Sequence, residues 1–281
     1  MGLFASMHSG VDVIRDMPPF RAMRKAAFDR RFEGNIPAHL FRGVFDTFDA
    51  AAAAAPDSLP LGYDNDASSN LYLQRLHIDE YDYPAMFWIA QSMTEGLRTI
   101  VDLGGSVGIK YFAFGRVMAF PADLVWRVIE VPAVVERGRR LAVDKGASRS
   151  LEFSVHLADA DGVDVVFASG SLQYLPQTLA QMLTSMTRKP RRIIVNTTPI
   201  HPSRSFFTLN SIGTAYCPYR VQSHEDFVTD VTREGFVLRD QWLNRGKGMF
   251  LPFESGASVD HYSGFCFDAV PAIRDDKVTS R

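Results

Sequence analysis

Cysteine is scarce in this sequence of 281 residues, where only Cys217 and Cys266 occur. The two form neither a C-x-x-C pair nor the spacing of a zinc site, and nothing indicates an oxidising compartment. Cys266 lies in the apolar run from Gly264 to Phe267. We therefore expect Cys266 to be a buried core residue.

An excess of charge of either sign is also missing, because 30 Lys and Arg stand against 32 Asp and Glu, a net charge of −2. Without a basic field, nucleic acid is not an expected partner. No apolar stretch approaches the ~20 residues that span a bilayer, and the first residues lack the core of a signal peptide. We expect a cytoplasmic protein with no membrane partner.

The N-terminal third of the chain has the pattern of helices and loops. Helices are expected over residues 20–31 and 43–55 and from Tyr83-Pro84 onward, where proline suits the first turn. Residues 43–95 carry many Asp and Glu and only one basic residue, Arg75. This acidic segment is interpreted as a solvated face, with an acidic approach to a cationic ligand as the alternative.

From Thr99 onward, strand-like and helical segments alternate, which predicts a mostly parallel sheet covered on both faces. Two further strand-like segments, 236–243 and 261–270, follow with no helix between them, so an antiparallel pair is expected to close the sheet. The earlier expected strands are 99–103, 125–131, 151–157, 163–168 and 192–197, and the expected helices are 107–120, 133–144, 177–187 and 225–233.

A glycine-rich turn follows the first of these strands, in the stretch I-V-D-L-G-G-S-V-G at residues 100–108. Turns of this kind let a ligand approach backbone amides at the start of a helix. A nicotinamide fingerprint fails in both registers, since Ser106 and Ile109, or Val107 and Lys110, stand where glycines are needed. A Walker pattern fails as well, because no Gly-Lys-Ser/Thr follows.

The pattern D-x-G-G-S-x-G resembles motif I of the class I S-adenosylmethionine (SAM) methyltransferases, with Ser106 at the middle glycine. The resemblance implies an α/β, Rossmann-like fold: a seven-stranded, mostly parallel sheet with an antiparallel final strand, plus an N-terminal helical lid. It implies a lid over residues 1–95, a SAM-binding domain over 96–272 and a disordered tail over 273–281. The turn residues implied to contact SAM are Asp102, Gly104, Gly105, Ser106 and Gly108.

Further SAM contacts are implied at the ends of the next strands. Glu130 ends the strand V-W-R-V-I-E, where an acid can accept hydrogen bonds from both ribose hydroxyls, and Val131 follows it. Asp159, in L-A-D-A with Ala160, fits the position that contacts the adenine amino group. The stretch D-V-V-F-A-S-G-S-L-Q-Y-L-P at 164–176 resembles motif IV, which places four residues by the methionine end or the acceptor: Ser169, Gly170, Ser171 and Gln173.

Candidate catalytic residues are Tyr174, Ser171 and His201. Tyr174 lies in the motif IV loop and is expected to point at the methyl-bearing end. His201 follows the fifth strand and is the preferred general base, with His224 as the second choice. No cluster has convincing metal spacing, so no metal is expected. The segment 199–222 is interpreted as a long loop whose aromatic residues roof the pocket.

Four phrases together, F-R-G-V-F-D-T-F, D-Y-P-A-M-F-W, S-G-S-L-Q-Y-L-P and H-Y-S-G-F-C-F, look like a family of bacterial methyltransferases with an N-terminal helical lid. Azetidine-2-carboxylate synthases, which cyclise SAM, look like relatives. The expected function is SAM-dependent methylation of a small molecule, a sugar or a natural-product intermediate. The alternatives are a SAM cyclase that forms azetidine-2-carboxylate and methylthioadenosine, and a SAM-binding module without activity. Homodimer formation is left open.

Overall fold

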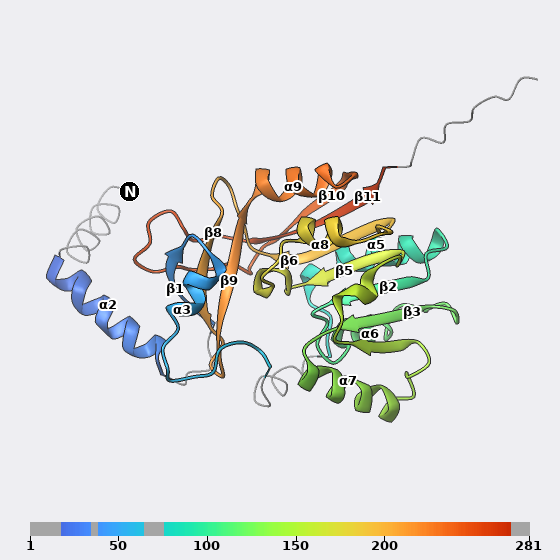
Figure 1. The fold of residues 1–281 in the computed structure, drawn as a ribbon, viewed down its shortest axis with the longest axis horizontal. Coiled ribbons are helices and arrows are strands. Elements are labelled where there is room, and N and C mark those ends of the chain that lie inside the picture. Colours follow the sequence, from blue (N-terminus) through green and yellow to red (C-terminus); the bar gives the residue numbers. More distant parts are fainter. Residues whose placement is uncertain (1–17, 35–38, 65–75, 271–281) are drawn as a thin grey trace, which may run out of the picture.

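The computed structural model describes residues 18–34, 39–64 and 76–270. Figure 1 shows a large twisted sheet flanked by helices, with a smaller sheet beside it that carries the N-terminal part of the chain. The expected tail, residues 273–281, lies outside the described residues.

Seven strands form the large sheet: β2 (Thr99–Leu103), β3 (Val125–Ile129), β4 (Leu151–Ser154), β5 (Val165–Ser169), β6 (Arg192–Thr198), β10 (Phe236–Asn244) and β11 (Tyr262–Ala269). Their order across the sheet is β10-β11-β6-β5-β2-β3-β4. All neighbours from β6 to β4 pair in parallel, and β11 runs antiparallel to both β6 and β10. The sequence prediction of a mostly parallel sheet with an antiparallel final strand is confirmed.

Helices cover both faces of this sheet: α5 (Tyr83–Thr94), α6 (Ile109–Phe114) and α7 (Pro132–Asp144) on one face, and α8 (Leu179–Ser185) and α9 (His224–Arg233) on the other. Side chains of a strand alternate between the faces, so Ile100 packs with the first group and Val101 with the second. Trp126, packed against Phe114 and Phe167, is fully buried. Each large apolar side chain buried in this way contributes about 1.5–3 kcal/mol.

The helix boundaries follow local signals. Ser223 caps α9 by accepting the Asp226 N–H at 3.0 Å, and Gly235 follows the helix with a φ of 92°. The helix expected over residues 107–120 is shorter than predicted, because α6 ends at Phe114, before Gly115. Glycine carries the highest backbone entropy cost in a helix, which favours an end at this point.

The smaller sheet differs most from the sequence prediction. It consists of four strands, β1 (Leu40–Phe45), β7 (Ile200–His201), β8 (Phe206–Ser211) and β9 (Tyr216–Ser223), in the order β1-β8-β9-β7. The expected loop at 199–222 is therefore mainly strand. The expected helix at 43–55 is reduced to α3 (Phe48–Ala53), whose N-cap Thr47 accepts the Ala50 N–H at 3.0 Å.

The N-terminal region is thus not purely helical. Strand β1 pairs with β8 far along the chain, and α2 (Pro18–Phe32) packs its last turn under the small sheet, where Phe32 stacks on Tyr216 at 5.3 Å. Helix α5 lies in the core of the large sheet, with Ala85 and Ile89 fully buried. The segment expected to form one helical lid therefore contributes to both parts of the molecule.

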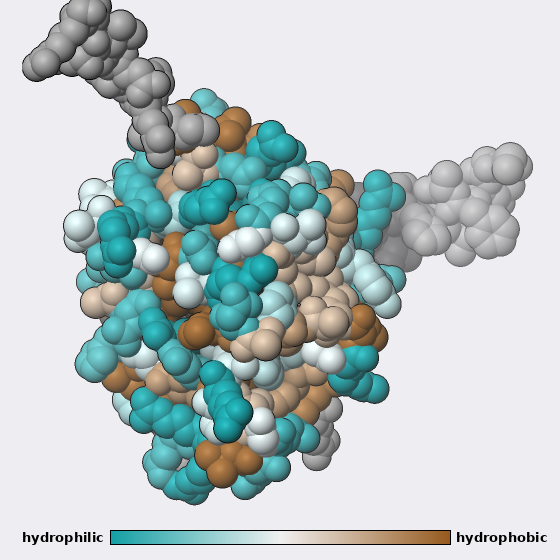
Figure 2. Space-filling model, turned by 90° about the vertical axis from the view of Figure 1, so that its right-hand side faces the viewer, coloured by the Kyte–Doolittle hydropathy of each residue, from teal (hydrophilic) through white to brown (hydrophobic). Residues whose placement is uncertain are grey.

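The surface carries polar residues over most of the face shown in Figure 2, with hydrophobic residues interspersed among them. Among the described residues, no helix has the length and apolar character needed to cross a membrane.

Candidate functional site

The glycine turn lies at the carboxyl end of β2, between this strand and α6. Gly104 has a φ of 67° and its N–H donates to the Ile129 carbonyl at 2.9 Å. A Cβ on Gly104 would come within 2.4 Å of Ser171 Cβ, and one on Gly105 within 2.4 Å of Asp102 Oδ2. Both positions therefore require glycine, and the turn is packed directly on the two side chains that would otherwise be displaced.

Glu130 lies beside this turn, at the end of the neighbouring strand β3. Its Oε1 accepts the Ser106 N–H at 3.1 Å, and its Oε2 accepts the Val131 N–H at 3.0 Å. Burial raises the pKa of Glu130, while these two backbone hydrogen bonds act to lower it. Asp64, which accepts the Ala133 N–H at 3.4 Å, adds a second negative charge nearby. The turn and the acid thus form one unit with acceptor capacity left on the carboxylate.

Asp102 lies underneath the turn and is 1% exposed. Its Oδ2 accepts the Trp126 Nε1–H at 3.2 Å, whereas its Oδ1 has no hydrogen-bond partner among the described residues. Burial raises the pKa of Asp102 to about 7, against smaller lowering effects of the Trp126 hydrogen bond and the Lys110 charge. A cation or hydrogen-bond donor placed here would stabilise the ionised carboxyl.

A buried ion pair lies beside the turn and was not expected from the sequence. Asp82 ends the 3₁₀ turn η1 (Glu80–Asp82), is 0% exposed, and contacts Lys110 Nζ through Oδ2 at 2.6 Å. Asn196, at the end of β6, donates its Nδ2–H to Asp82 Oδ1 at 3.2 Å. The interpretation of 43–95 as a solvated acidic face is therefore wrong at Asp82. The one available signal was its place directly before the Tyr83-Pro84 helix start, a position that favours a capping acid.

The candidate adenine contact lies at the end of β4, the strand next to β3. Asp159 belongs to the 3₁₀ turn η2 (Leu157–Ala160), and its Oδ2 accepts a hydrogen bond from the Ser154 hydroxyl. The Asp159 carbonyl accepts from Arg127 Nη1 at 3.1 Å, while Ala160 is buried. Because β3 and β4 run parallel, the turn that carries Asp159 follows β4 at the edge of the sheet where Glu130 follows β3. Asp159 is exposed and therefore accessible to a ligand.

The loop after β5 continues along this edge. Gly170 has a φ of 74° and donates its N–H to the Asn196 carbonyl at 2.9 Å, while Ser169 Oγ lies 3.4 Å from Thr197 Oγ1. Ser171 donates its hydroxyl to the Leu103 carbonyl. This bond connects the loop to the end of β2, so Ser171 holds the loop in place. The hydroxyl proton of Ser171 is already used in this hydrogen bond.

Tyrosine rings connect this loop to the small sheet. The loop continues into η3 (Leu172–Tyr174), and the Tyr174 ring meets those of Tyr63 and Tyr219 edge to face, with 4.9 Å between centroids in both pairs. The Tyr174 hydroxyl donates to Asn210 Oδ1 at 3.2 Å. Burial raises the pKa of Tyr262, whose hydroxyl lies 2.6 Å from that of Tyr219, to about 12. Burial also raises the pKa of Tyr219, so the phenols of Tyr219 and Tyr262 are neutral at physiological pH.

His201, the preferred base, has a structural role in this geometry. Its Nδ1 accepts the Ser203 N–H at 3.1 Å and the Arg204 N–H at 3.0 Å, so Nε2 carries the proton and donates to the Gly256 carbonyl at 2.8 Å. Because both ring nitrogens are engaged by backbone groups, neither can take a proton from a substrate. In this structure His201 stabilises a turn and is not placed to act as the predicted general base.

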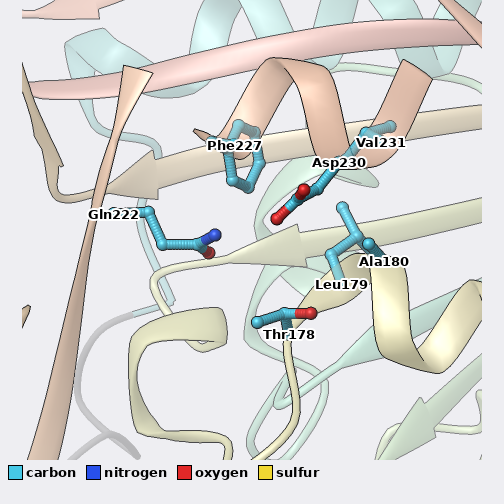
Figure 3. A pocket seen from close by; sticks show the side chains of 7 residues that line it. All are labelled: Thr178, Leu179, Ala180, Gln222, Phe227, Asp230 and Val231. Atoms are coloured by element: carbon cyan, nitrogen blue, oxygen red, sulfur yellow. The ribbon is translucent and has the colours of Figure 1, made fainter. Parts of the chain in front are cut away.

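His224, the second choice, starts α9 and its Nε2 lies 2.8 Å from Gln241 Oε1 on the surface. The nearby groove between α8 and α9, with an empty volume of about 150 Å³, is shown in Figure 3. Its lining residues include no member of the glycine turn or of the loop after β5; they are Thr178, Leu179, Ala180, Gln222, Phe227, Asp230 and Val231. Without a nucleophile or a catalytic histidine, this groove is not the candidate site.

Within residues 18–34, 39–64 and 76–270, no group of three or more His, Cys, Asp or Glu side chains is arranged to hold a metal ion.

Comparison with known proteins gives no family model and no curated protein that matches the sequence. Three solved structures illustrate the similarity in fold. The mitomycin 7-O-methyltransferase MmcR is 18% identical, with 66% of this chain and 54% of that chain covered and a TM-score of 0.41. A 1,6-didemethyltoxoflavin-N1-methyltransferase from Burkholderia thailandensis is 14% identical (73% and 83% covered, TM-score 0.47). The SAM-dependent methyltransferase SibL is 13% identical (96% and 77% covered, TM-score 0.47).

This chain spans about half the length of MmcR. The strand order defines the fold: the parallel strands extend in two directions from the β2–β5 pair, and the antiparallel strand β11 lies between β6 and β10. By this topology, the chain has the Rossmann-like fold of the class I methyltransferases.

Proposed function

We propose that this protein is a SAM-dependent methyltransferase that acts on a small molecule, a sugar or a natural-product intermediate. One observation carries the proposal: the Ser106 N–H in the glycine turn and the Glu130 carboxylate meet at 3.1 Å at the ends of adjacent parallel strands. In doubly wound sheets, nucleotide-like ligands bind at this edge. The acid and the turn form a single cradle of the kind that a ribose and the group attached to it require.

The residues at this cradle fit SAM. Glu130 offers both carboxylate oxygens to the two ribose hydroxyls, in addition to the backbone N–H groups that it already accepts. Asp102 Oδ1, a buried acceptor without a partner, fits the ammonium group of the amino acid part. Asp159 and Ala160 would contact the adenine.

The charge at the site supports SAM over a dinucleotide. Asp102, Glu130 and Asp64 are acidic groups next to the glycine turn, and the ammonium group of Lys110 is already paired with Asp82. A cationic ligand is attracted by such a site, whereas the pyrophosphate of a dinucleotide would be repelled by it. The failure of the nicotinamide pattern in the sequence agrees with this preference.

When bound, SAM supplies a methyl group on a positively charged sulfur. The chain then has to orient the acceptor toward that methyl group and exclude water. We propose that Gln173 and Tyr174 line the methyl-bearing end and that the small sheet, through Tyr63 and Tyr219, roofs the acceptor side. Ser171 and Asn210 hold this arrangement in place through their hydrogen bonds to Leu103 and Tyr174.

Product analysis tests the proposed function. Purified protein is incubated with SAM alone and with SAM plus a mixture of amino sugars, neutral sugars, phenols and small amines. Methyl transfer predicts S-adenosylhomocysteine and a methylated product only in the second reaction. Methylthioadenosine and a cyclic amino acid formed from SAM alone would replace the proposal with the cyclase.

A further inference from the structure

Asn196, at the end of β6, has an amide orientation that its partners determine. Its Nδ2 faces Asp82 Oδ1 at 3.2 Å, and a carboxylate can only accept a hydrogen bond. Its Oδ1 faces Trp242 Nε1 at 3.1 Å, and an indole can only donate. The Asn196 oxygen therefore points toward β10, and any further side chain that meets this oxygen must present a donor.

Asn244, the last residue of β10, is that further side chain. Its Nδ2 donates to Asn196 Oδ1 at 3.2 Å, which leaves its own Oδ1 to face away from Asn196. Asn244 is 1% exposed, and its Oδ1 has no hydrogen-bond partner among the described residues. A buried amide oxygen without a partner is destabilising and calls for an explanation, such as a ligand that supplies the missing donor.

A second oxygen of the same kind belongs to Gln173, in the loop after β5. Gln173 is 4% exposed, its side chain hydrogen-bonds Tyr219, and its Oε1 has no partner among the described residues. Tyr219 shares a hydrogen bond with Tyr262, which lies directly opposite Asn244 in the β10–β11 pair. Gln173 thus contacts this tyrosine pair through Tyr219, and Asn244 lies beside it through the strand pairing with Tyr262.

Hydrogen bonds, strand pairing and chain proximity arrange these residues as a ring near the end of β6. Gly170, whose added Cβ would lie 4.0 Å from Gln173 Nε2, donates its N–H to the Asn196 carbonyl. The chain of contacts thus runs from Gly170 through Gln173, the tyrosine pair and Asn244 back to Asn196. Its position next to the loop after β5 is the acceptor side of the proposed SAM site.

The two oxygens without partners, Asn244 Oδ1 and Gln173 Oε1, indicate which chemical group a ligand would have to supply. Both unfilled atoms are hydrogen-bond acceptors, so the group must be a donor. Two lysines lie nearby: Lys110 Nζ is held by Asp82 at 2.6 Å and lies 3.8 Å from Asp79, and Lys247 Nζ lies 5.3 Å from the ring centroid of Tyr81 and 5.8 Å from that of Tyr262. An amino group brings two or three N–H donors, whereas a hydroxyl brings one.

We propose that Asn244 and Gln173 bind an amino group of the substrate, so that the enzyme acts on amine-bearing small molecules. The inference rests on the proposed function, because it places the amine on the acceptor side of the SAM site. The amino group belongs to a separate acceptor molecule or, if Asp102 does not hold the SAM ammonium group as proposed above, to the amino acid part of SAM itself.

The test compares matched pairs of probes that differ only in the donor group: tryptamine with tryptophol, and benzylamine with benzyl alcohol. Binding is measured by ligand-observed NMR and calorimetry, with and without S-adenosylhomocysteine. In the wild-type protein, each amine is expected to bind about tenfold or more tightly than its alcohol, as charge-assisted hydrogen bonds do relative to neutral ones. The Asn244→Leu variant is expected to lose this preference.

The melting temperature of Asn244→Leu shows whether a loss of amine binding comes from the missing oxygen or from a disturbed structure. Asn196 Oδ1 keeps its Trp242 donor when Asn244 is replaced, and leucine has the same branched arrangement of side-chain heavy atoms, so Asn244→Leu is expected to unfold at the same temperature or higher. Gln241→Leu is the matched control, because it removes an exposed amide from the same strand whose oxygen has a partner in His224. This control is expected to keep the amine preference, and Asn244→Ala repeats the test with a smaller side chain.

The two sources of the amine give different results. If the amine belongs to SAM, an analogue of SAM without the α-amino group binds the wild type more weakly than SAM, and Asn244→Leu abolishes that difference. If it belongs to the acceptor, Asn244→Leu leaves SAM affinity unchanged and loses only the amine preference. An amine preference that persists in folded Asn244→Leu and Asn244→Ala overturns the inference. A wild type that prefers amines without binding SAM would refute the proposed function alone.

Discussion

The backbone N–H of Ser106 donates to Glu130 Oε1 at 3.1 Å, and this bond joins the glycine turn after β2 to the acid after β3. Ser106 has a φ of 55°, in the left-handed region that residues other than glycine rarely adopt, so its conformation is strained. A ligand that uses Glu130 therefore shares its carboxylate with the turn, and the two elements hold each other in place.

Replacing Ser106 by glycine should stabilise the protein. Glycine adopts the observed φ without steric cost, so the free energy of unfolding is expected to rise by about 1 kcal/mol, while Ser106→Val is expected to lower it by about 1–2 kcal/mol. Urea denaturation of both variants measures the difference. Equal stabilities of the glycine and valine variants would show that the turn is not held in the left-handed conformation.

The raised pKa of Asp102 should make stability depend on pH. Because the folded-state pKa is about 7 and the ordinary value is 3.8, the folded protein holds a proton that the unfolded chain releases between these values. Stability therefore falls as pH rises from about 4 to about 7, by at most roughly 4 kcal/mol, at about 1.4 kcal/mol per pKa unit.

Asp102→Asn removes this titration. It should match the wild type near pH 4.5 and exceed it in unfolding free energy near pH 8, as urea denaturation at the two pH values would show. Asp123→Asn is the control, because Asp123 is an exposed aspartate paired with Arg98. Its unfolding free energy should differ from that of the wild type by the same amount at both pH values. If Asp102→Asn also differs from the wild type by the same amount at both pH values, the raised pKa of Asp102 does not control the pH dependence of stability.

The Lys110–Asp82 pair should show strong coupling. Replacing Lys110 by methionine leaves the carboxylate of Asp82, 0% exposed, without its cation, and is expected to cost about 3–5 kcal/mol. The double variant Lys110→Met/Asp82→Asn removes both charges and should cost less than the sum of the single changes. A double-mutant cycle in urea at pH 7 measures this, and strict additivity would argue against a direct pair.

His201→Ala should affect stability more than catalysis. The change leaves the Ser203 and Arg204 N–H groups without their acceptor and is expected to cost about 1–3 kcal/mol. A general base normally contributes about 10²–10⁴-fold to the rate. We expect kcat to stay within about twofold, and a hundredfold loss in a variant of normal stability would restore His201 as the base.

The sequence predicted the large sheet well because its signals are local. Gly104, Gly105 and Gly108 lie within five residues of the chain, and β2, β3 and β5 are each followed by a helix before the next strand, so period and spacing suffice. Glu130 could be placed for the same reason, since the end of a strand fixes the edge of the sheet at which its next residue lies.

The small sheet could not be predicted in this way. Strand β1 finds its partner β8 more than a hundred residues later, and Gly43 and Val44 carry no sign of that pairing. His201 was misjudged because its partners are backbone groups, one of them the distant Gly256 carbonyl, which leave no pattern in the sequence. The Asp82–Asn196–Asn244 contacts likewise join three separate segments and become visible only after folding.

Calorimetric titration with SAM tests the central claim most directly. The wild type and Glu136→Gln, a control on the exposed surface of α7, should bind one SAM per chain with equal affinity. Glu130→Gln should bind about 10- to 100-fold more weakly, since a hydrogen bond to a charged group contributes about 1.5–3 kcal/mol. Its melting temperature should fall modestly, because glutamine can accept only one of the Ser106 and Val131 N–H groups, and the titration is made well below it. No binding to the wild type, or equal affinity in Glu130→Gln, would contradict the account.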